Sequence, residues 1–355
     1  MRLRSLRWIG DFCTHVLPRH GHHVKALHIR AERLSVSLPP PQYVPHQADV
    51  LYERWVALAL HGADEDTANR LVRFRRSLLA QIIGALPRLI LVVIYIREIF
   101  PPGMQGFEVQ DATRTAGGRI TSILIHDFGV QTNTYATEED LGHLITRLPN
   151  LEVLNLDVYL LPAGRATLQR AITSLPSLRE LYIRSEGHYL NPDLLNLPWR
   201  PLLKALALVS IRSLTLPTLV KLLTHVGDTL EWLHLRNTPK EISEREAEDH
   251  LYPIPFPKLK FFNLTTPHDA RQLRLFVTAP LGHLSVGFCP QIEAEEWLSF
   301  VAEHSSTLRQ VEVETVRLLR KDELARLKAR CADDGIEFAC GTAEWKYFPD
   351  AQVIA

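Results

Sequence analysis

Three histidines form the tightest cluster of potentially reactive side chains in this sequence. His20, His22 and His23 occur in the stretch RHGHH, and imidazoles at this spacing could hold a metal ion. A metal site needs several convergent ligands with supporting hydrogen bonds, and no cysteine or carboxylate cluster stands beside these histidines in the sequence. We therefore interpret RHGHH as a turn with exposed histidines and expect no metal ion.

Short motifs that mark common enzyme and nucleotide sites are missing from the sequence. GxGxxG, GxxxxGK(S/T), GxSxG and HExxH do not occur, and Gly117 and Gly118 fit a loop better than a phosphate-binding turn. We expect no catalytic residues and no cofactor, and therefore a protein that is not an enzyme. The alternative that stays open is an enzyme, such as a hydrolase, whose site lies in residues 31–78.

Four cysteines, at positions 13, 289, 331 and 340, form no CxxC unit and are too few for a disulfide framework. Cys13 and Cys331 fall on apolar stripes with the spacing of a helix. We interpret both as small core residues rather than reactive thiols.

The overall composition is that of a folded protein without a dominant charge. Forty basic residues balance forty acidic ones, which argues against binding to nucleic acid or an anionic membrane through the overall field. The most apolar run, LILVVIYI at 89–96, is too short to cross a bilayer. The basic stretch MRLRSLRWIG lacks the apolar segment of a secretory signal after it. We expect a soluble protein of the cytoplasm or nucleus, with no nucleic-acid or membrane partner.

Aromatic and arginine side chains that alternate with leucines suggest protein recognition. Successive residues of a strand point to opposite faces, so the residues between core leucines share the other face. Aromatic and arginine residues on a rigid face commonly anchor protein interfaces. The alternative, that these large side chains only shield a sheet, stays open. The candidate partner-binding residues are Tyr95, His126, Tyr182, Arg184, Trp232, His234, Arg236, Phe261, Asn263 and His283, with Glu312 and Glu314 further along the chain.

Strands must position these side chains, and the sequence repeats one strand-like pattern ten times. The pattern is L-x-x-L-x-L with related apolar residues, and from position 89 onward it recurs every 22 to 31 residues. A repeat at such intervals is typical of stacked structural units. The copies are VKALHI (24), LILVVI (89), ITSILI (120), LEVLNL (151), LRELYI (178), LKALAL (203), LEWLHL (230), LKFFNL (259), LGHLSV (281) and LRQVEV (308).

Between several copies lies an apolar stripe with the period of a helix. Leu141, Leu144, Ile145 and Leu148 fall at i, i+3, i+4 and i+7, and the same spacing recurs at 79–86, 168–175 and 219–226. Each unit therefore reads as a helix, a tight turn and a short strand. Units of this size bury their apolar faces only by stacking, with parallel strands joined by right-handed crossovers.

This combination is similar to leucine-rich repeats of the helical, ribonuclease-inhibitor-like type. The line FPKLKFFNL, at 256–264, resembles the repeats of fungal F-box proteins, although no F-box fits before the first copy at residue 24. The resemblance implies an α/β solenoid, a right-handed horseshoe with parallel strands on the concave face and helices on the convex face. We expect one solenoid over 1–355: an N-terminal repeat or cap (1–30), an insertion or degenerate repeat (31–78), core repeats (79–320) and a C-terminal cap (321–355).

The functional expectation is an intracellular scaffold that binds a protein partner on its concave face. The resemblance implies the substrate-recognition part of an F-box (SCF-type) ubiquitin ligase, with SCF components as partners if an F-box lies upstream. The alternative from the same resemblance is a leucine-rich-repeat regulator or inhibitor without a link to ubiquitin.

Overall fold

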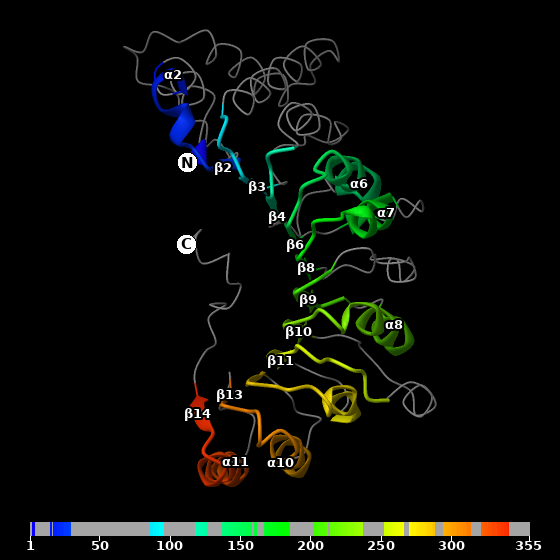
Figure 1. The fold of residues 1–355 in the computed structure, drawn as a ribbon, viewed down its shortest axis with the longest axis vertical. Coiled ribbons are helices and arrows are strands. Elements are labelled where there is room, and N and C mark those ends of the chain that lie inside the picture. The colour runs from blue at the N-terminus through cyan, green and yellow to red at the C-terminus, as the bar shows by residue number, and fades with distance from the viewer. Residues whose placement is uncertain are drawn as a thin grey trace, which may run out of the picture. The chain divides into compact units, whose positions relative to one another are not determined.

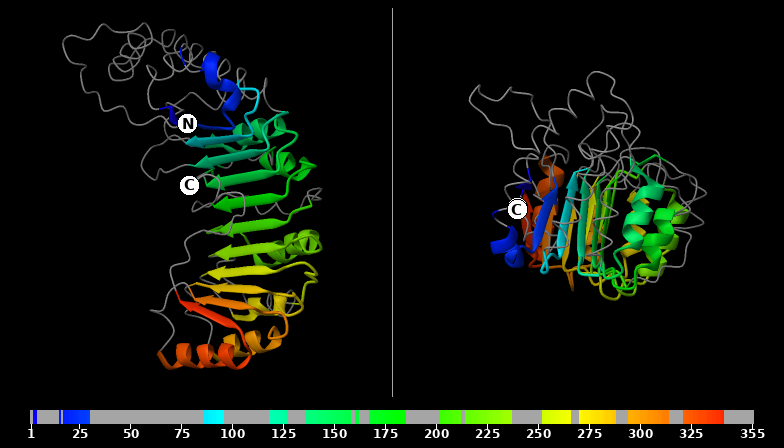
Figure 2. Two further views of the ribbon diagram at one scale, coloured as in Figure 1. Left: turned by 60° about the vertical axis from the view of Figure 1, so that its left-hand side comes forward. Right: turned by 90° about the horizontal axis from the view of Figure 1, so that it is seen from above.

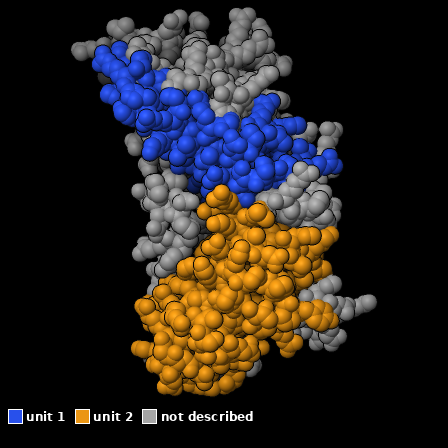
Figure 3. Space-filling model, viewed as in Figure 1, with its two compact units in different colours: residues 1–178 blue, residues 179–355 orange. Residues whose placement is uncertain are grey.

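The computed structural model describes residues 2–3, 15, 17–29, 86–95, 118–126, 136–157, 160–161, 167–184, 202–211, 214–236, 252–265, 270–287, 294–313 and 321–340. Contacts divide the chain into two compact units, residues 1–178 and residues 179–355 (Figure 3). The segment at 31–78, Cys13, Cys289 and Glu314 lie outside the described residues.

Unit 1, residues 1–178, contains parallel strands that follow one another in the order of the sequence. They are β1 (Arg2–Leu3), β2 (Ala26–Ile29), β3 (Leu91–Tyr95), β4 (Ser122–His126) and β6 (Val153–Asp157). Two short strands, β5 (Ala136–Thr137) and β7 (Leu160–Leu161), pair separately. The helical elements are α2 (Leu17–His20), η2 (Gly21–His23), α6 (Glu138–Thr146) and α7 (Thr167–Ser174).

Unit 2, residues 179–355, also has parallel strands in sequence order (Figure 2). They are β8 (Glu180–Arg184), β9 (Ala205–Val209), β10 (Trp232–Arg236), β11 (Phe261–Thr265), β12 (His283–Val286), β13 (Gln310–Val313) and β14 (Glu337–Cys340). The helical elements are α8 (Leu216–Val226), η5 (Ala270–Phe276), α10 (Ala294–Glu303) and α11 (Lys321–Asp333). Helices α8 and α10 lie on one side of these strands (Figure 1). The expectation of an α/β protein with parallel strands is confirmed.

All ten copies of the repeated pattern coincide with strands. In each copy the strand begins at the third residue, and the fourth residue is a buried aliphatic or aromatic side chain. In unit 2 the register aligns these fourth residues from strand to strand, as in Leu206, Leu233 and Phe262. Because parallel strands joined by helices are covered on the helix side, these side chains form the layer between sheet and helices.

Proline-containing turns lead from helix to strand at several repeats. The backbone N–H of Leu89, Leu151 and Leu259 donates to the carbonyl three residues earlier, at 3.1, 3.1 and 3.3 Å. Proline occupies the second position of each turn, in LPRL, LPNL and FPKL, where its fixed φ suits a β-turn. The residues that made the pattern recognisable therefore also form the turn.

A ladder of backbone hydrogen bonds joins successive repeats just before each strand. The carbonyl of the second residue of one copy accepts two N–H groups from the next copy. In unit 2 the Lys204 carbonyl accepts from Glu231 at 2.8 Å and from Trp232 at 3.0 Å. The Glu231 carbonyl accepts from Lys260 at 2.9 Å and from Phe261 at 3.1 Å. These bonds satisfy buried backbone groups and fix the register that places the strand side chains.

The predicted helical stripes are buried where the structure describes them. The stripe residues at 141–148, 168–175 and 219–226 are all buried, in or directly after α6, α7 and α8. The terminal helix and strand of the predicted C-terminal cap are α11 and β14, with Cys331 fully buried. The sequence reasoning did not identify β1, the β5–β7 pair or η5.

Candidate functional site

The described candidate binding residues of unit 2 share one face of its sheet. They alternate with the buried leucines of β8, β10, β11 and β12, so they lie on the face opposite α8 and α10. We call this surface the opposite face. It comprises Glu180, Tyr182 and Arg184; Ala205, Ala207 and Val209; Trp232, His234 and Arg236; Phe261, Asn263 and Thr265; His283 and Ser285; Gln310 and Glu312; and Glu337 and Ala339.

The two remaining candidates, Tyr95 and His126, belong to unit 1. Tyr95 ends β3, His126 ends β4, and the parallel register makes them direct neighbours. Their side chains lie outside the described part of the structure.

One part of the opposite face is an apolar cluster. Tyr182, Ala207 and Val209 pack together, and the half-buried ring of Trp232 lies against them. Ala207 is fully buried and Tyr182 is 7% exposed. The indole of Trp232 also meets the His234 ring edge to face, with 6.0 Å between ring centroids. A tryptophan held this way has little rotamer entropy left to lose on binding.

The register places an arginine on each side of this cluster. Arg184 pairs with Val209, and Val209 pairs with Arg236 on its other side. Arg236 is exposed and Arg184 is half-buried. With neighbouring strands about 4.8 Å apart, the two arginine backbones are about 10 Å apart. Both stand at the carboxyl ends of their strands.

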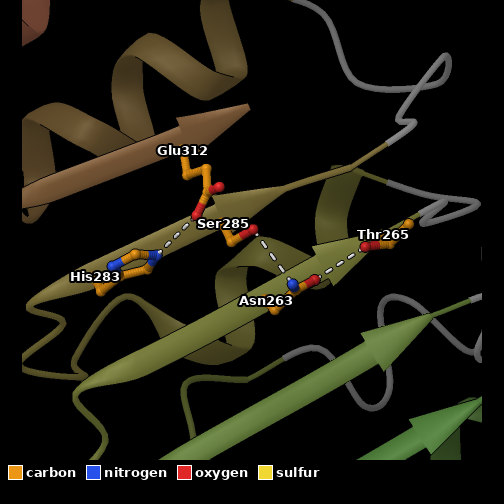
Figure 4. A network of polar contacts seen from close by, with 5 residues as sticks. All are labelled: Asn263, Thr265, His283, Ser285 and Glu312. Atoms are coloured by element: carbon orange, nitrogen blue, oxygen red, sulfur yellow. Dashed lines mark hydrogen bonds and ion pairs between the residues drawn. The ribbon is translucent and has the colours of Figure 1, made fainter. Parts of the chain in front are cut away.

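The other part of the opposite face is a network of polar side chains on β11, β12 and β13 (Figure 4). The Asn263 amide donates to the Ser285 hydroxyl at 3.2 Å, and the Thr265 hydroxyl donates to Asn263 Oδ1 at 2.9 Å. His283 Nε2 lies 3.6 Å from Glu312 Oε2. These links join three neighbouring strands, so the polar side chains are positioned by one another.

Burial keeps the histidines of this face in their neutral form. Burial, and secondarily the positive charge of Arg236, lowers the pKa of His234 to about 3. Burial also lowers the pKa of His283, although the carboxylate of Glu312 opposes that shift. Neither imidazole therefore carries the positive charge that binding an anionic group would need, whereas the arginines do.

Phe261 is the most accessible large aromatic side chain of the opposite face. It is 37% exposed, and its ring is tilted against that of His283, with 5.6 Å between centroids. Tyr182, His234 and His283 are buried instead, so they support the face more than they present side chains to a partner. The accessible candidates are Phe261 and Arg236, with Trp232, Arg184 and Asn263 half-buried.

Sequence reasoning treated the strand LKALAL as a gap between candidate strands. In the structure its small residues Ala207 and Val209 form the centre of the apolar cluster. Their side chains occupy the same face as Tyr182 and Trp232, in register with them. The available signal was the alternation itself, because positions 205, 207 and 209 are all apolar between strands that place aromatics there. Thr265 and Ser285 were also missed, although the same alternation places them on this face of β11 and β12.

The other sequence candidates lie elsewhere. His20, His22 and His23 are exposed on α2 and η2, as the interpretation of RHGHH predicts. Within the described ranges, no group of three histidine, cysteine or acidic side chains is arranged to hold a metal ion. None of the helices in that part of the chain is long and apolar enough to cross a membrane.

Comparison with known proteins does not place this chain in a family. No protein-family model matches it, and the curated proteins yield no significant match.

Proposed function

We propose that this chain is a protein-interaction scaffold of the leucine-rich-repeat kind, and that its opposite face in unit 2 binds a protein partner. The observation that supports this most is the combination of an aromatic and apolar cluster with two flanking arginines on one rigid sheet face. Tryptophan, tyrosine and arginine are the residues that dominate binding energy at interfaces. A scaffold of this kind needs no catalytic residues or cofactor.

Several features of the fold suit such a role. The side chains that point to the opposite face are held by a parallel sheet whose register is fixed by repeated backbone bonds. A partner would therefore meet a surface already in its binding geometry, which lowers the entropy cost of association. The stacked repeats proposed for 1–355 as one solenoid would extend such a surface along the chain.

The test measures partner recovery with a variant that changes only accessible residues. Trp232 packs on the apolar cluster, so its truncation would remove packing as well as binding. Phe261→Ala combined with Arg236→Ala removes the exposed aromatic and the exposed charge. We expect specific partners, quantified by mass spectrometry after capture from cell extract, to fall by about tenfold or more, since hot-spot truncations cost roughly 2 kcal/mol.

The matched control is Lys328→Ala, an exposed residue of α11 rather than of a strand. It should recover the same partners as the wild-type chain, and circular dichroism should show that both variants are folded. Equal recovery by wild type and the double variant would contradict the proposal.

The resemblance to fungal F-box proteins supports a narrower proposal, in which the bound partner is a substrate presented to an SCF-type ubiquitin ligase. Its test is co-purification of the ligase adaptor with the chain extended by its upstream coding sequence. Failure to recover the adaptor would remove the ubiquitin role and leave a regulator or inhibitor that uses the same face.

A further inference from the structure

We propose that the partner carries an acidic side chain, Asp or Glu, which binds between two exposed cations at the amino ends of β11 to β13. This inference rests on the proposed function and adds the chemistry of the partner. The residues concerned are Lys258, Lys260, Gly282 and Arg309, which we call the basic edge. Lys260 directly precedes Phe261, the accessible aromatic residue of the opposite face, so the basic edge continues the proposed interface.

Backbone hydrogen bonds place the members of the basic edge in adjacent repeats. The Lys260 carbonyl accepts the N–H of Gly282 at 2.9 Å, and the Gly282 carbonyl accepts the N–H of Arg309 at 2.8 Å. With neighbouring strands about 4.8 Å apart, the backbones of Lys260 and Arg309 are about 10 Å apart. Two cations therefore flank a position that has no side chain.

The space over Gly282 is open. A Cβ added there would meet, among the described atoms, the Lys260 carbonyl oxygen at 3.7 Å and nothing closer. That distance is an ordinary van der Waals contact. A side chain from a partner can therefore enter between Lys260 and Arg309 without displacing the backbone.

The cations of the basic edge are exposed and have no acidic partner among the described residues. Lys258, Lys260 and Arg309 are all exposed, and none of them forms a salt bridge in the described part of the chain. The preceding repeats differ, because Lys204 lies 3.6 Å from the carboxylate of Glu231. An acidic group on a partner would complement the charge of the basic edge.

The carboxylates that lie nearest along the chain belong to other surfaces. The turns at 256–260, 279–282 and 304–309 contain no Asp or Glu. Glu303, the last residue of α10, accepts a hydrogen bond from Ser299 of the same helix at 3.4 Å. The positive charge at the amino ends of β11 and β13 is thus available to a partner.

The two cations suit a carboxylate by their chemistry. A guanidinium has five N–H donors and an ammonium has three. Arg309 donates one of its N–H groups to the Leu308 carbonyl at 3.4 Å, which leaves other donors for a ligand. Both side chains are long and flexible enough to converge on one carboxylate over Gly282, and such charge-assisted hydrogen bonds are the stronger kind.

The position of Phe261 adds a second requirement on the partner. Phe261 is 37% exposed and follows Lys260 directly, so a partner residue close to the acid meets its ring. An extended segment rises about 3.3 Å per residue, which places the contacting residue about one to three positions from the acid. The expected motif is an Asp or Glu with an aliphatic or aromatic residue close to it in the sequence.

The experiment selects random dodecapeptides displayed on phage with the folded full-length chain as the target. We expect enriched sequences that contain the motif. A synthetic peptide of that sequence, measured by fluorescence anisotropy, should bind about fivefold more weakly to Lys260→Gln and to Arg309→Gln, the size expected for an exposed ion pair. Lys328→Gln removes an exposed positive charge from α11 and should leave binding unchanged.

Substitutions at Gly282 test the gap itself. Gly282→Glu gives the chain its own carboxylate between the two cations, so peptide binding should weaken by about tenfold or more through competition and repulsion. Gly282→Ala should change binding by less than about twofold, because its methyl group is small. Gly282 does not have a positive φ, and both variants should therefore keep the wild-type melting temperature.

Changes in the peptide test the same contact without altering the fold. Replacing the acid by its amide, Asp by Asn or Glu by Gln, should weaken binding to the wild-type chain. Against Lys260→Gln or Arg309→Gln the same replacement should have a smaller effect, since one charged partner is already gone. Binding should also weaken as salt rises.

Four results would overturn the inference: no enriched peptide, enrichment without acidic residues, acidic peptides insensitive to the changes at Lys260, Gly282 and Arg309, or tighter binding of a single-stranded RNA oligonucleotide than of any peptide. Non-acidic peptides whose binding falls in Phe261→Ala would leave the proposed function standing while this inference fails. If Phe261→Ala changes neither peptide binding nor the recovery of captured partners, the proposed function fails as well.

Discussion

At the scale of single residues, the buried histidine His234 makes the stability of the fold depend on pH. His234 is 3% exposed in the middle of β10, and its pKa falls from 6.5 to about 3 on folding. The unfolded chain therefore binds this proton more readily than the folded chain does. Relative to the unfolded chain, the folded chain has its full stability at this site above pH 6.5. That stability is lost progressively as the pH falls toward 3, because the unfolded chain takes up the proton first.

We expect His234→Gln to reduce the acid sensitivity of the fold. The linkage relation gives the wild-type chain a loss of about 2 kcal/mol at this site between pH 7 and pH 5, and glutamine has no such proton. Urea unfolding at the two pH values measures the difference. His225→Gln, on the exposed surface of α8, should keep the wild-type difference. An unchanged pH dependence in His234→Gln would contradict the assigned burial effect.

Two cysteines near the end of the described chain differ in their environment. Cys331 is fully buried in α11, and burial raises the pKa of its thiol to about 11. Cys340 is exposed at the end of β14. Since the thiolate is the reactive form, the two cysteines should react at very different rates.

Alkylation with iodoacetamide at pH 8 should therefore modify Cys340 in the folded chain and leave Cys331 intact over the same time. Peptide mass spectrometry reads the two sites separately, and denaturation in urea should make both reactive. Equal labelling of the two sites before denaturation would show that α11 does not cover Cys331.

At the scale of elements, close approach of neighbouring repeats sets what each helix tolerates. A Cβ added at Gly142 in α6 would lie 2.7 Å from the backbone nitrogen of Leu168 in α7. Backbone atoms cannot move aside as a flexible side chain can, so the two helices would have to separate. Gly142 is thus required by packing between repeats.

We expect Gly142→Ala to destabilise unit 1 by about 1–2 kcal/mol, because overpacking outweighs the gain of up to about 1 kcal/mol in helix propensity. Gly118→Ala is the matched control, since a Cβ there meets nothing within 4 Å. It should change stability by no more than about 0.5 kcal/mol. Thermal unfolding of both variants measures the contrast, and equal melting temperatures would argue against the α6–α7 contact.

The elements also show how far the sequence alone can lead. Leucine spacing predicted every repeated strand, because one strand face must be buried and its period is two. The turns were predictable for a related reason, since proline favours the second turn position. The short pairs made by β1 and by β5 with β7 depend on backbone neighbours distant in sequence, and each of these three strands has only two residues, which are too few to show a period.

The sequence predicted which face of the sheet each candidate residue occupies, but not which of these side chains are buried. Alternation placed Tyr182, His234 and His283 on the same face as Arg236 and Phe261. Which of them are covered depends on side chains of the neighbouring strands, such as Trp232 beside Ala207, and the spacing within one strand does not encode that. The polar network of Asn263, Thr265 and Ser285 requires the register between strands for the same reason.

At the scale of the whole molecule, stacked repeats contact mainly their neighbours, so damage should stay local. Leu154 in β6 is fully buried and is aligned with Ile123 of β4. Leu154→Asp places a charge there without a partner, at a cost of several kcal/mol. We expect hydrogen exchange to rise most in β4 and β6 and much less in β2.

Leu154→Met, a substitution of similar volume, controls for the change of side chain and should cost under about 1.5 kcal/mol. Equal loss of protection in every described strand after Leu154→Asp would show global cooperative unfolding and contradict nearest-neighbour stacking.

Position-specific photo-crosslinking in cells tests the proposed binding face most directly. A benzophenone amino acid is placed singly at Phe261 and Arg236 on the opposite face, and at Glu296 and Lys328, which are exposed on α10 and α11. The opposite face should yield one shared partner adduct from Phe261 and Arg236, and none from the two helix positions. Adducts that arise only from α10 and α11, or equally from all four positions, would contradict binding through the sheet.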